Sequence, residues 1–201
     1  MIRLLLADDQ ELIRSALVVL LGLQDDFEVV ASVGRGDEVL AAARAHQPDV
    51  ALLDIEMPGI DGLAAAGVLA QELPQIRSLI LTTFGRPGYL RRAMESGAYG
   101  FVVKDAPPEQ LADAIRRVAA GERVVDPVLV AATLASGVTP LTARERDVLV
   151  AARPGATVAE IADKLCLSEG TIRNYLSTAI AKTSARNRTE AVRLADEHGW
   201  L

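Results

Sequence analysis

The sequence predicts an α/β fold, in which helices cover both faces of a five-stranded parallel sheet, and a second, all-α domain beyond it. Runs of aliphatic residues begin near positions 2, 28, 49, 77 and 99, and amphipathic segments separate them. Runs that are apolar at nearly every position are typical of parallel strands, because such strands are buried on both faces. Beyond residue 138 only helical patterns remain, which marks the second domain.

The first domain spans residues 1–121 and alternates strands with helices along its length. Its predicted helices span residues 11–22, 37–46, 61–72, 87–97 and 107–120. Parallel strands joined through helices require right-handed crossovers, which place helices on both faces of the sheet. We expect the flavodoxin-like strand order 2-1-3-4-5, whose switch point lies between the first and third strands.

Gly121 ends this alternation of strand and helix. Residues 122–138 (ERVVDPVLVAATLASGV) are predicted to form a linker that has room for one short helix, Val128–Ala135. Because the pattern differs on the two sides of this segment, it is expected to separate two domains.

The second domain, residues 139–201, is predicted to contain four helices. They span residues near 142–152, 157–165, 169–183 and 187–198. Thr142 and Thr157 each precede a glutamate by three positions, which is the spacing of a capping box, and Ser168 can cap the third helix. These signals mark where the first three helices begin.

Composition favours a soluble cytoplasmic protein with ample material for a core. Half of the 201 residues are hydrophobic, and the net charge is −6. Asp8 and Asp9 interrupt the first apolar run too soon for a signal peptide, and no segment approaches the length of a membrane span. The single cysteine, Cys166, excludes an internal disulfide. Because it lies between two leucines, we expect it to be a small buried apolar residue.

Polar side chains follow four of the predicted strands at the point where each strand ends. Asp8 and Asp9 come directly after the first run, and Asp54 ends the third. Thr82 ends the fourth run with a hydroxyl group, and Lys104 ends the fifth. Because ligands bind beyond the carboxyl ends of parallel strands, we expect these five side chains to converge on one site.

Three neighbouring carboxylates repel one another, and the repulsion is tolerable only where protons or a cation compensate it. Oxygen ligands without Cys or His favour a hard divalent ion, magnesium above all, over zinc. A carboxylate can attack phosphorus to form an acyl phosphate, while a metal ion and an ammonium group neutralise the transferred oxygens. The residues therefore predict a phosphoryl-accepting site with a divalent metal, in which Lys104 supplies the ammonium group and Thr82 a hydroxyl.

At these residues the chain resembles bacterial two-component response regulators, which have an N-terminal receiver domain. The resemblance rests on Asp8-Asp9, the segment 54–62 (DIEMPGIDG), Thr82 and the segment 101–104 (FVVK). It implies that Asp54 accepts phosphate from a sensor histidine kinase.

The same resemblance assigns roles to the residues around the acceptor. It implies that Asp9, Asp54 and the main-chain carbonyl of Glu56 bind Mg²⁺, and that Asp8 acts mostly through water. It also implies that Thr82 follows the phosphoryl group when the receiver switches.

Phe101 occupies the aromatic switch position of the family, although its pattern alone is that of a core residue. Many receivers have tyrosine at this position. Because phenylalanine cannot donate a hydrogen bond, any switching by Phe101 must be steric. Asp105 stands where many receivers have proline, but Lys-Asp is familiar in the branch that has this kind of second domain.

The segment 157–176 (TVAEIADKLCLSEGTIRNYL) has the pattern of a helix-turn-helix. The apolar residues of its second helix recur on one side, which leaves Arg173, Asn174 and Ser177 on the other; arginine and asparagine can read guanine and adenine in the major groove. Between residues 164 and 193, six basic side chains face only two acidic ones, an excess suited to phosphates. The other candidate DNA contacts are Lys164, Ser168, Thr171, Tyr175, Lys182, Arg186 and Arg188.

Together with the segments 141–149 (LTARERDVL) and 187–192 (NRTEAV), the helix-turn-helix resembles the LuxR/NarL-type output domain across residues 139–200. The chain departs from this family at residues 182–186 (KTSAR), where leucine usually follows the lysine and an aliphatic residue stands in place of Ala185. The departure shrinks the apolar contact expected between the last two helices.

The two resemblances imply a DNA-binding transcriptional response regulator, not an enzyme. Phosphorylation of Asp54 is expected to bias a two-state receiver toward a homodimer that binds paired sites on double-stranded DNA. The segments 81–89 (LTTFGRPGY) and 170–175 (GTIRNY) also resemble regulators of membrane-lipid desaturation genes. Two alternatives stay open: a magnesium-dependent phosphohydrolase that uses Glu56 as its second acid, and a regulator that binds DNA constitutively with an unused acidic site.

Overall fold

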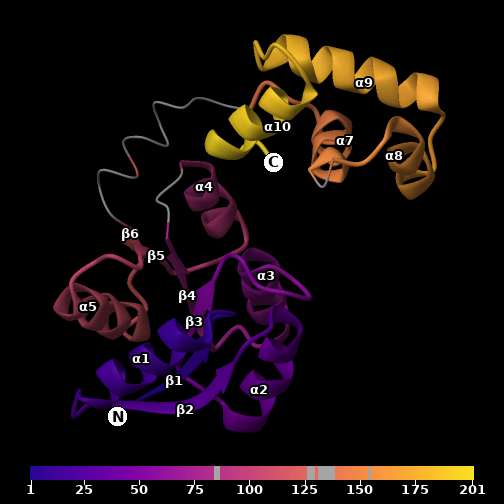
Figure 1. The fold of residues 1–201 in the computed structure, drawn as a ribbon. Helices are drawn as coiled ribbons and strands as arrows, with labels where there is room; N and C mark the ends of the chain where they lie inside the picture. Colours follow the sequence, from indigo (N-terminus) through magenta and orange to yellow (C-terminus); the bar gives the residue numbers. More distant parts are fainter. Residues whose placement is uncertain (84–86, 126–129, 131–138, 154) are drawn as a thin grey trace. The chain divides into compact units, whose positions relative to one another are not determined.

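A computed structural model describes the chain except for residues 84–86, 126–129, 131–138 and 154 (Figure 1). It contains two compact units, one made of Met1–Gly85 and Leu90–Val130 and the other containing Ala131–Leu201. Each unit has its own apolar core. The helix predicted at Val128–Ala135 lies outside the described residues apart from Val130.

A single parallel sheet forms the centre of the first unit. Its strands are β1 (Ile2–Ala7), β2 (Phe27–Val33), β3 (Val50–Asp54), β4 (Arg77–Thr82), β5 (Gly100–Val103) and β6 (Val124–Val125). The strands pair in parallel in the order β2-β1-β3-β4-β5-β6, which confirms the order predicted for the first five.

The sheet has one strand more than predicted, because β6 forms within the segment expected to be a linker. The Val124 N–H donates to the Tyr99 carbonyl at 2.9 Å, and the two valines pair with Gly100 and Phe101 of β5. A run of two valines is shorter than the usual strand, so its pattern does not distinguish it from a linker. The sheet therefore continues past residue 121, where the first domain was predicted to end.

Helices connect the strands and cover both faces of the sheet. They are α1 (Glu11–Gly22), the 3-10 turn η1 (Gly36–Glu38), α2 (Val39–His46), α3 (Gly62–Glu72), α4 (Pro87–Glu95) and α5 (Pro108–Ala119). In Figure 1, α1 and α5 lie on one side of the sheet, and α2 and α3 on the other. Helix α4 ends before the predicted residue 97, because Gly97 adopts a left-handed conformation with a φ of 87°.

The face of the sheet under α1 and α5 carries the main apolar core of the first unit. Leu4, Leu52 and Leu79, from three adjacent strands, are fully buried there with Ile115 of α5. Burial of each such side chain stabilises the fold by about 1.5 to 3 kcal/mol. This packing holds the strands, and hence their carboxyl ends, in a fixed register.

The only regular secondary structure in the described residues of the second unit is helical, as predicted. Its helices are α7 (Ala143–Ala152), α8 (Val158–Leu165), α9 (Glu169–Lys182) and α10 (Arg188–Glu197). Thr142 and Thr157 form both predicted capping boxes, since each hydroxyl accepts an N–H three residues on and each threonine N–H donates to the glutamate there. Ser168 caps α9 as predicted. No described helix in either unit is long and apolar enough to cross a membrane.

Cys166 is exposed, so the expectation that it is buried was wrong. It follows α8 with a φ of 54°, a left-handed conformation that ends the helix, and its N–H donates to the Asp163 carbonyl at 3.3 Å. This turn leaves the thiol in solvent, while the flanking Leu165 and Leu167 pack against the apolar core.

Candidate functional site

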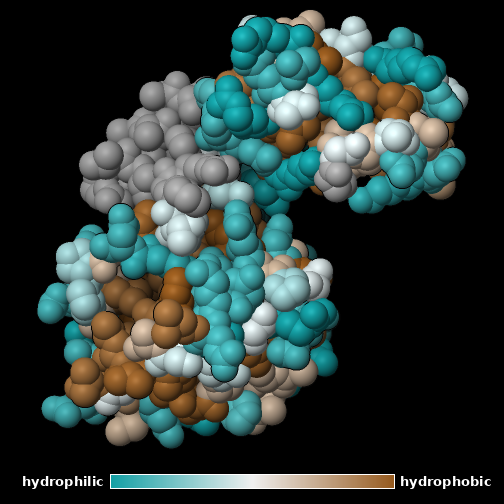
Figure 2. Space-filling view, viewed as in Figure 1, coloured by the Kyte–Doolittle hydropathy of each residue, from teal (hydrophilic) through white to brown (hydrophobic). Residues whose placement is uncertain are grey.

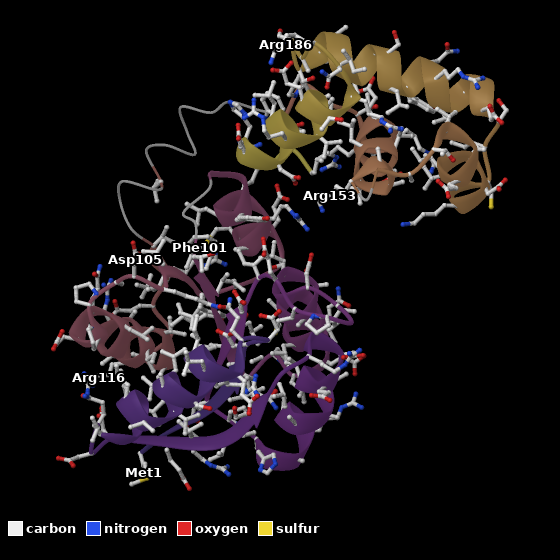
Figure 3. The ribbon with its side chains drawn as sticks, in the orientation of Figure 1. Met1, Phe101, Asp105, Arg116, Arg153 and Arg186 are labelled. Atoms are coloured by element: carbon white, nitrogen blue, oxygen red, sulfur yellow. The ribbon has the colours of Figure 1, made fainter. Side chains whose placement is uncertain are left out.

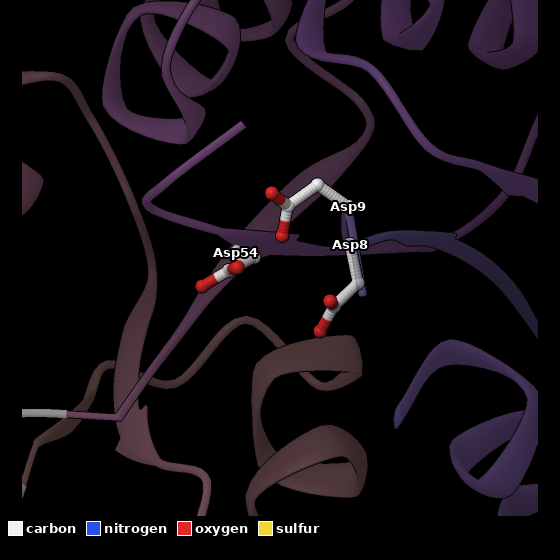
Figure 4. A group of neighbouring side chains, drawn as sticks. All are labelled: Asp8, Asp9 and Asp54. Carbon is white, nitrogen blue, oxygen red and sulfur yellow. The ribbon is translucent and has the colours of Figure 1, made fainter. Parts of the chain in front are cut away.

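The three predicted carboxylates meet at the carboxyl ends of β1 and β3. Asp8 and Asp9 follow β1, Asp54 ends β3, and one carboxylate oxygen of each lies within 4.8 Å of the others (Figure 4). Asp8 is fully buried and Asp54 is 4% exposed, whereas Asp9 is exposed. The cluster therefore has two buried acids and one acid in contact with solvent.

Lys104 neutralises part of this cluster. Its Nζ lies 2.7 Å from Oδ2 of Asp8 and 2.9 Å from Oδ2 of Asp54, and its side chain is 8% exposed. Burial lowers the pKa of Lys104, but the two carboxylates outweigh burial and raise this pKa above its ordinary value. Burial raises the pKa of Asp54, and the opposing effect of Lys104 does not cancel it. Two buried carboxylates thus share one cation.

Local hydrogen bonds fix the orientation of the two buried acids. Oδ1 of Asp8 accepts the Gln10 N–H at 2.9 Å, and Oδ1 of Asp54 accepts the Ile55 N–H at 2.8 Å. The Arg14 guanidinium donates to the main-chain carbonyl of Asp8 at 2.6 Å. Both carboxylates are therefore oriented by their own loops.

Thr82 and Phe101 lie on the neighbouring strands β4 and β5. Asp54 pairs with Leu81 across β3 and β4, which places Thr82 one residue beyond the acceptor, where it is 3% exposed. The Thr82 carbonyl accepts the Lys104 N–H at 2.7 Å. Phe101, labelled in Figure 3, is 1% exposed, as expected of a core residue, and its role as a switch stays a prediction.

The loop after Asp54 is held by a close approach of two backbones. The Gly36 N–H donates to the Pro58 carbonyl at 3.1 Å, and a Cβ at Gly36 would lie 1.9 Å from the Ile60 carbonyl oxygen. Only glycine fits at this contact. The same loop carries Glu56, whose side chain is exposed and whose carbonyl is the predicted metal ligand.

The acidic site fits a magnesium ion. Its donors are carboxylate oxygens, and their separation within 4.8 Å allows two of them to bind one octahedral ion that keeps several waters. The exposed position of Asp9 leaves room for those waters. Within the part of the chain that the structure describes, no histidine or cysteine joins the cluster, which argues against zinc.

Helix α9 presents a polar face to solvent. Arg173, Asn174 and Ser177 are exposed, whereas Ile172 and Leu176 are buried in the core of the second unit. The inward and outward faces of this helix are therefore those predicted. Because α9 follows α8 after a short turn, it has the place of a recognition helix in a helix-turn-helix.

Two of the predicted phosphate contacts near the start of α10 already bond within the second unit. Arg186, labelled in Figure 3, pairs with Glu190 at 2.9 Å, and this bond lowers the pKa of Glu190 to about 2. Arg188 donates to the Ala156 carbonyl at 2.7 Å. Both arginines can still offer further N–H groups to a phosphate, since a guanidinium has five.

The remaining predicted DNA contacts lie on α8, on α9 or in the turn between them. Lys182 pairs with Glu145 of α7 at 2.8 Å, and Arg173 pairs with Glu169 one turn away at 2.6 Å. The Arg173–Glu169 pair lies on one helix and is exposed, so Arg173 can easily exchange Glu169 for another partner. The Lys182–Glu145 pair differs, because Glu145 is buried. The others are Lys164, Ser168, Thr171, Asn174, Tyr175 and Ser177.

Three residues with contacts at these sites were not identified from the sequence in that role. Arg14 supports the loop of Asp8, Gly36 supports the loop after β3, and Glu145 was recognised only as part of a capping box. A glycine shortly after a predicted strand was a usable signal for Gly36. Lys182, the partner of Glu145, lies too far away in the sequence for their pairing to leave a local signal.

Comparison with known proteins identifies both halves of the chain. Residues 4–116 match the response regulator receiver domain, and residues 139–195 match the bacterial regulatory proteins of the luxR family. The chain is 44% identical over 201 residues to the transcriptional regulatory protein DesR of Bacillus subtilis, with 100% of both chains covered. It is 35% identical over 206 residues to the DNA-binding transcriptional activator DevR/DosR of Mycobacterium tuberculosis, covering 98% of this chain and 95% of that protein.

A solved structure gives the same result. The crystal structure of the response regulator ChrA, from a heme-sensing two-component system, is similar with a TM-score of 0.60 and 32% identity over 100% of this chain and 98% of that one. The named relatives are transcriptional regulators, which removes the phosphohydrolase alternative. The chain therefore belongs to the two-component response regulators that join a receiver domain to a LuxR-type DNA-binding domain, and it is a transcriptional regulator and not an enzyme.

Proposed function

We propose that a sensor histidine kinase phosphorylates Asp54, with Mg²⁺ bound beside it, and thereby switches the regulator to a dimer that binds promoter DNA. The environment of Asp54 carries the proposal. Its carboxylate is buried, lies within 4.8 Å of those of Asp8 and Asp9, and contacts Nζ of Lys104 at 2.9 Å. An acid in these surroundings is suited to phosphoryl transfer. An aspartate that only forms a turn or a helix cap would not require a buried position, two neighbouring carboxylates and a lysine.

The phosphoryl transfer uses groups that the strand ends bring together. A carboxylate oxygen of Asp54 attacks the phosphorus of a phosphohistidine, so that a P–O bond forms while the P–N bond breaks and the imidazole leaves with its electron pair. Lys104 donates to one transferred oxygen, and the Thr82 hydroxyl can turn toward another. Asp9, Asp54 and the Glu56 carbonyl would hold Mg²⁺, which supplies positive charge to the phosphoryl oxygens.

Switching requires contacts that differ between the two states of the receiver. Phosphorylation replaces the contact of Lys104 with a carboxylate by one with a phosphoryl group, and it draws Thr82 toward the acceptor. These gains stabilise only the state in which β4 and β5 allow them, so the population shifts toward that state. Phe101 on β5 responds sterically, because its ring carries no hydroxyl.

An apolar stripe on α1 supports the proposed dimer. Leu12, Val19 and Leu23 are 83%, 67% and 76% exposed, and their spacing of seven and four positions places them on one face of the helix and its end. Figure 2 shows apolar residues gathered on the first unit where Figure 1 places α1 and α5. Exposed apolar clusters mark interaction sites, and a second copy offers the same stripe. We therefore place the dimer contact there.

We assign phosphorylation to the domain predicted at residues 1–121, whose sheet extends to Val125. We assign DNA binding to the domain at residues 139–201, and the connection to the rest of the predicted linker 122–138. In the dimer, two copies of α9 bind paired half-sites, and the second copy binds at the effective concentration that the first one creates. Arg173 and Asn174 read base edges, as their exposure on α9 allows. Because the kinase donor and the DNA both occur in the cytoplasm, we place the protein there.

Intact mass spectrometry after incubation with acetyl phosphate tests the acceptor. Wild type should gain one phosphoryl group with Mg²⁺ and none after chelation, and Asp54→Asn should gain none. Asp49→Asn is the matched control, because Asp49 is an exposed aspartate just before β3, at the opposite end of the strand. It should be phosphorylated like wild type. If wild type gained no phosphoryl group from acetyl phosphate or from kinases, the proposal would be wrong and constitutive DNA binding would take its place.

A further inference from the structure

Lys182 was predicted to contact DNA phosphate, yet its charge is engaged inside the second unit. Its Nζ lies 2.9 Å from Oε1 and 2.8 Å from Oε2 of Glu145, so one ammonium group donates to both carboxylate oxygens. The side chain of Lys182 is 34% exposed and that of Glu145 is 5% exposed. The carboxylate of this ion pair is therefore buried while its ammonium group is partly exposed, so salt screens the pair less than one in which both side chains are exposed.

Glu145 is itself fixed to the start of α7. Its Oε2 accepts the Thr142 N–H at 2.7 Å, and its own N–H donates to the Thr142 hydroxyl at 3.3 Å. Burial raises the pKa of Glu145, but the bonds from Lys182 and Thr142 outweigh burial and hold this pKa below its ordinary value. The carboxylate is thus ionised at neutral pH, and Lys182 supplies its counter-charge.

The ion pair connects the first turn of α7 with the last turn of α9. Arg173 and Asn174 lie nearer the other end of α9, on its exposed face. Because a helix is stiff along its length, fixing its last turn also sets the direction in which these two side chains point. If Nζ moved away to a phosphate, a buried carboxylate would lose its counter-charge, which is unfavourable.

We propose that Lys182 is a positioning residue. With Glu145 it forms a clasp, the Glu145–Lys182 pair, that fixes the orientation of α9 on α7, and its ammonium group does not bind DNA phosphate. The clasp affects DNA binding through the direction of Arg173 and Asn174, so this inference rests on the proposed DNA-binding function. A clasp and a phosphate contact predict opposite effects when the charge of Glu145 is removed.

Glu145→Gln distinguishes the two roles in the full-length protein. Glutamine can keep the capping box with Thr142 but removes the charge that holds Lys182. Binding is measured by fluorescence anisotropy on a duplex selected in vitro with wild type and on a random duplex, each over a series of KCl concentrations. A freed phosphate-binding lysine should tighten binding to both duplexes and steepen the salt dependence. Loss of the clasp should instead weaken binding to the selected duplex, on the order of tenfold for coupled neighbours, with the salt slope unchanged.

Lys182→Met and Lys182→Arg complete the test, with Lys164→Met as the comparison for a lost phosphate contact, because Lys164 is an exposed lysine on α8 that was predicted to contact DNA. Loss of a phosphate contact lowers the salt slope by about one unit and weakens binding to both duplexes equally. Loss of the clasp lowers the preference for the selected duplex without changing the slope, and arginine should restore that preference because it can pair with Glu145.

The clasp is overturned by any of three results: tighter binding of Glu145→Gln, a slope lower by about one unit in Lys182→Met, or wild-type binding by both variants. Circular dichroism melting checks that each variant is folded at the assay temperature. If Lys182→Met is unfolded there, Glu145→Gln decides alone, since it keeps the lysine. A wild type that selects no duplex and binds no DNA would refute the proposed function itself, which separates that failure from failure of the clasp.

Discussion

Replacing Lys104 with methionine should destabilise the receiver domain at pH 7 by about 3 to 5 kcal/mol, the cost of removing one partner from a buried ion pair. Nζ lies 2.7 and 2.9 Å from two carboxylates, and at an effective dielectric constant of about 20 each attraction is roughly 6 kcal/mol. Desolvation of the three groups cancels a large share of that sum. Methionine keeps most of the length of the side chain, so the change is mainly one of charge.

The loss should shrink as the pH falls. Burial already raises the pKa of Asp54, and Lys104 opposes burial, so the variant should have this pKa raised further. A carboxyl group with a folded pKa above its unfolded value destabilises the fold when ionised. This penalty is fully present above the folded pKa and disappears as the pH falls below the ordinary value of 3.8. The variant should therefore approach the stability of wild type in acid.

Urea denaturation followed by far-UV circular dichroism measures the difference, with and without Mg²⁺. Mg²⁺ at about a hundred times its dissociation constant should stabilise the folded receiver by about 2.7 kcal/mol. The unfolding transition whose urea midpoint rises with Mg²⁺ is therefore that of the receiver domain. Lys164→Met, at an exposed lysine, is the control and should stay within about 0.5 kcal/mol of wild type. The reasoning is refuted if Lys104→Met matches wild type at pH 7, or if its deficit is the same in acid.

Three further changes test other parts of the structure. Gly36→Ala should weaken Mg²⁺ binding in calorimetric titration, because its Cβ would lie 1.9 Å from the Ile60 carbonyl oxygen and displace the loop of Glu56. Gly22→Ala is the control, because a Cβ at Gly22 would have nothing within 4 Å, and equal Mg²⁺ affinities of the two variants would contradict the role of the loop. Leu23→Ser should leave urea unfolding unchanged but weaken the dimer of phosphorylated protein in sedimentation, and an undiminished dimer would exclude the α1 stripe. Arg173→Ala should cost about 1 to 3 kcal/mol on a selected duplex and relax the preference at one base position, whereas an equal loss on all sequences would rule out base reading.

The place of the acidic site could be predicted because its signal is local. Parallel strands buried on both faces leave uninterrupted aliphatic runs, so a polar residue that ends such a run must lie at the carboxyl edge of the sheet. Asp8 and Asp54 follow this rule, and the structure brings their carboxylates to one lysine. Thr142 and Thr157 are equally local signals, because a capping box involves only four consecutive residues.

The features that the sequence did not predict depend on tertiary structure or on a single backbone angle. Glu145 and Lys182 stand 37 positions apart, and the capping box already explained the glutamate. Cys166 was expected to be buried because of its leucine neighbours, but its left-handed φ turns it to solvent. Val124 joins the sheet through the free edge of β5, and no pattern of two residues reveals such pairing.

The two buried acids that share one lysine make the receiver locally frustrated, in a domain where packing and pattern otherwise agree. The domain would be more stable with neutral side chains at these two positions. Natural proteins keep such conflicts at sites where function outweighs stability. Selection for heat resistance alone should therefore favour neutral substitutions at Asp8 or Asp54 and yield stable regulators that no longer respond to their signal. A small cation or a phosphoryl group can therefore affect the whole domain. When it reduces the repulsion between the two carboxylates, it changes the free energy of unfolding of the domain and not only the local energy of the pocket.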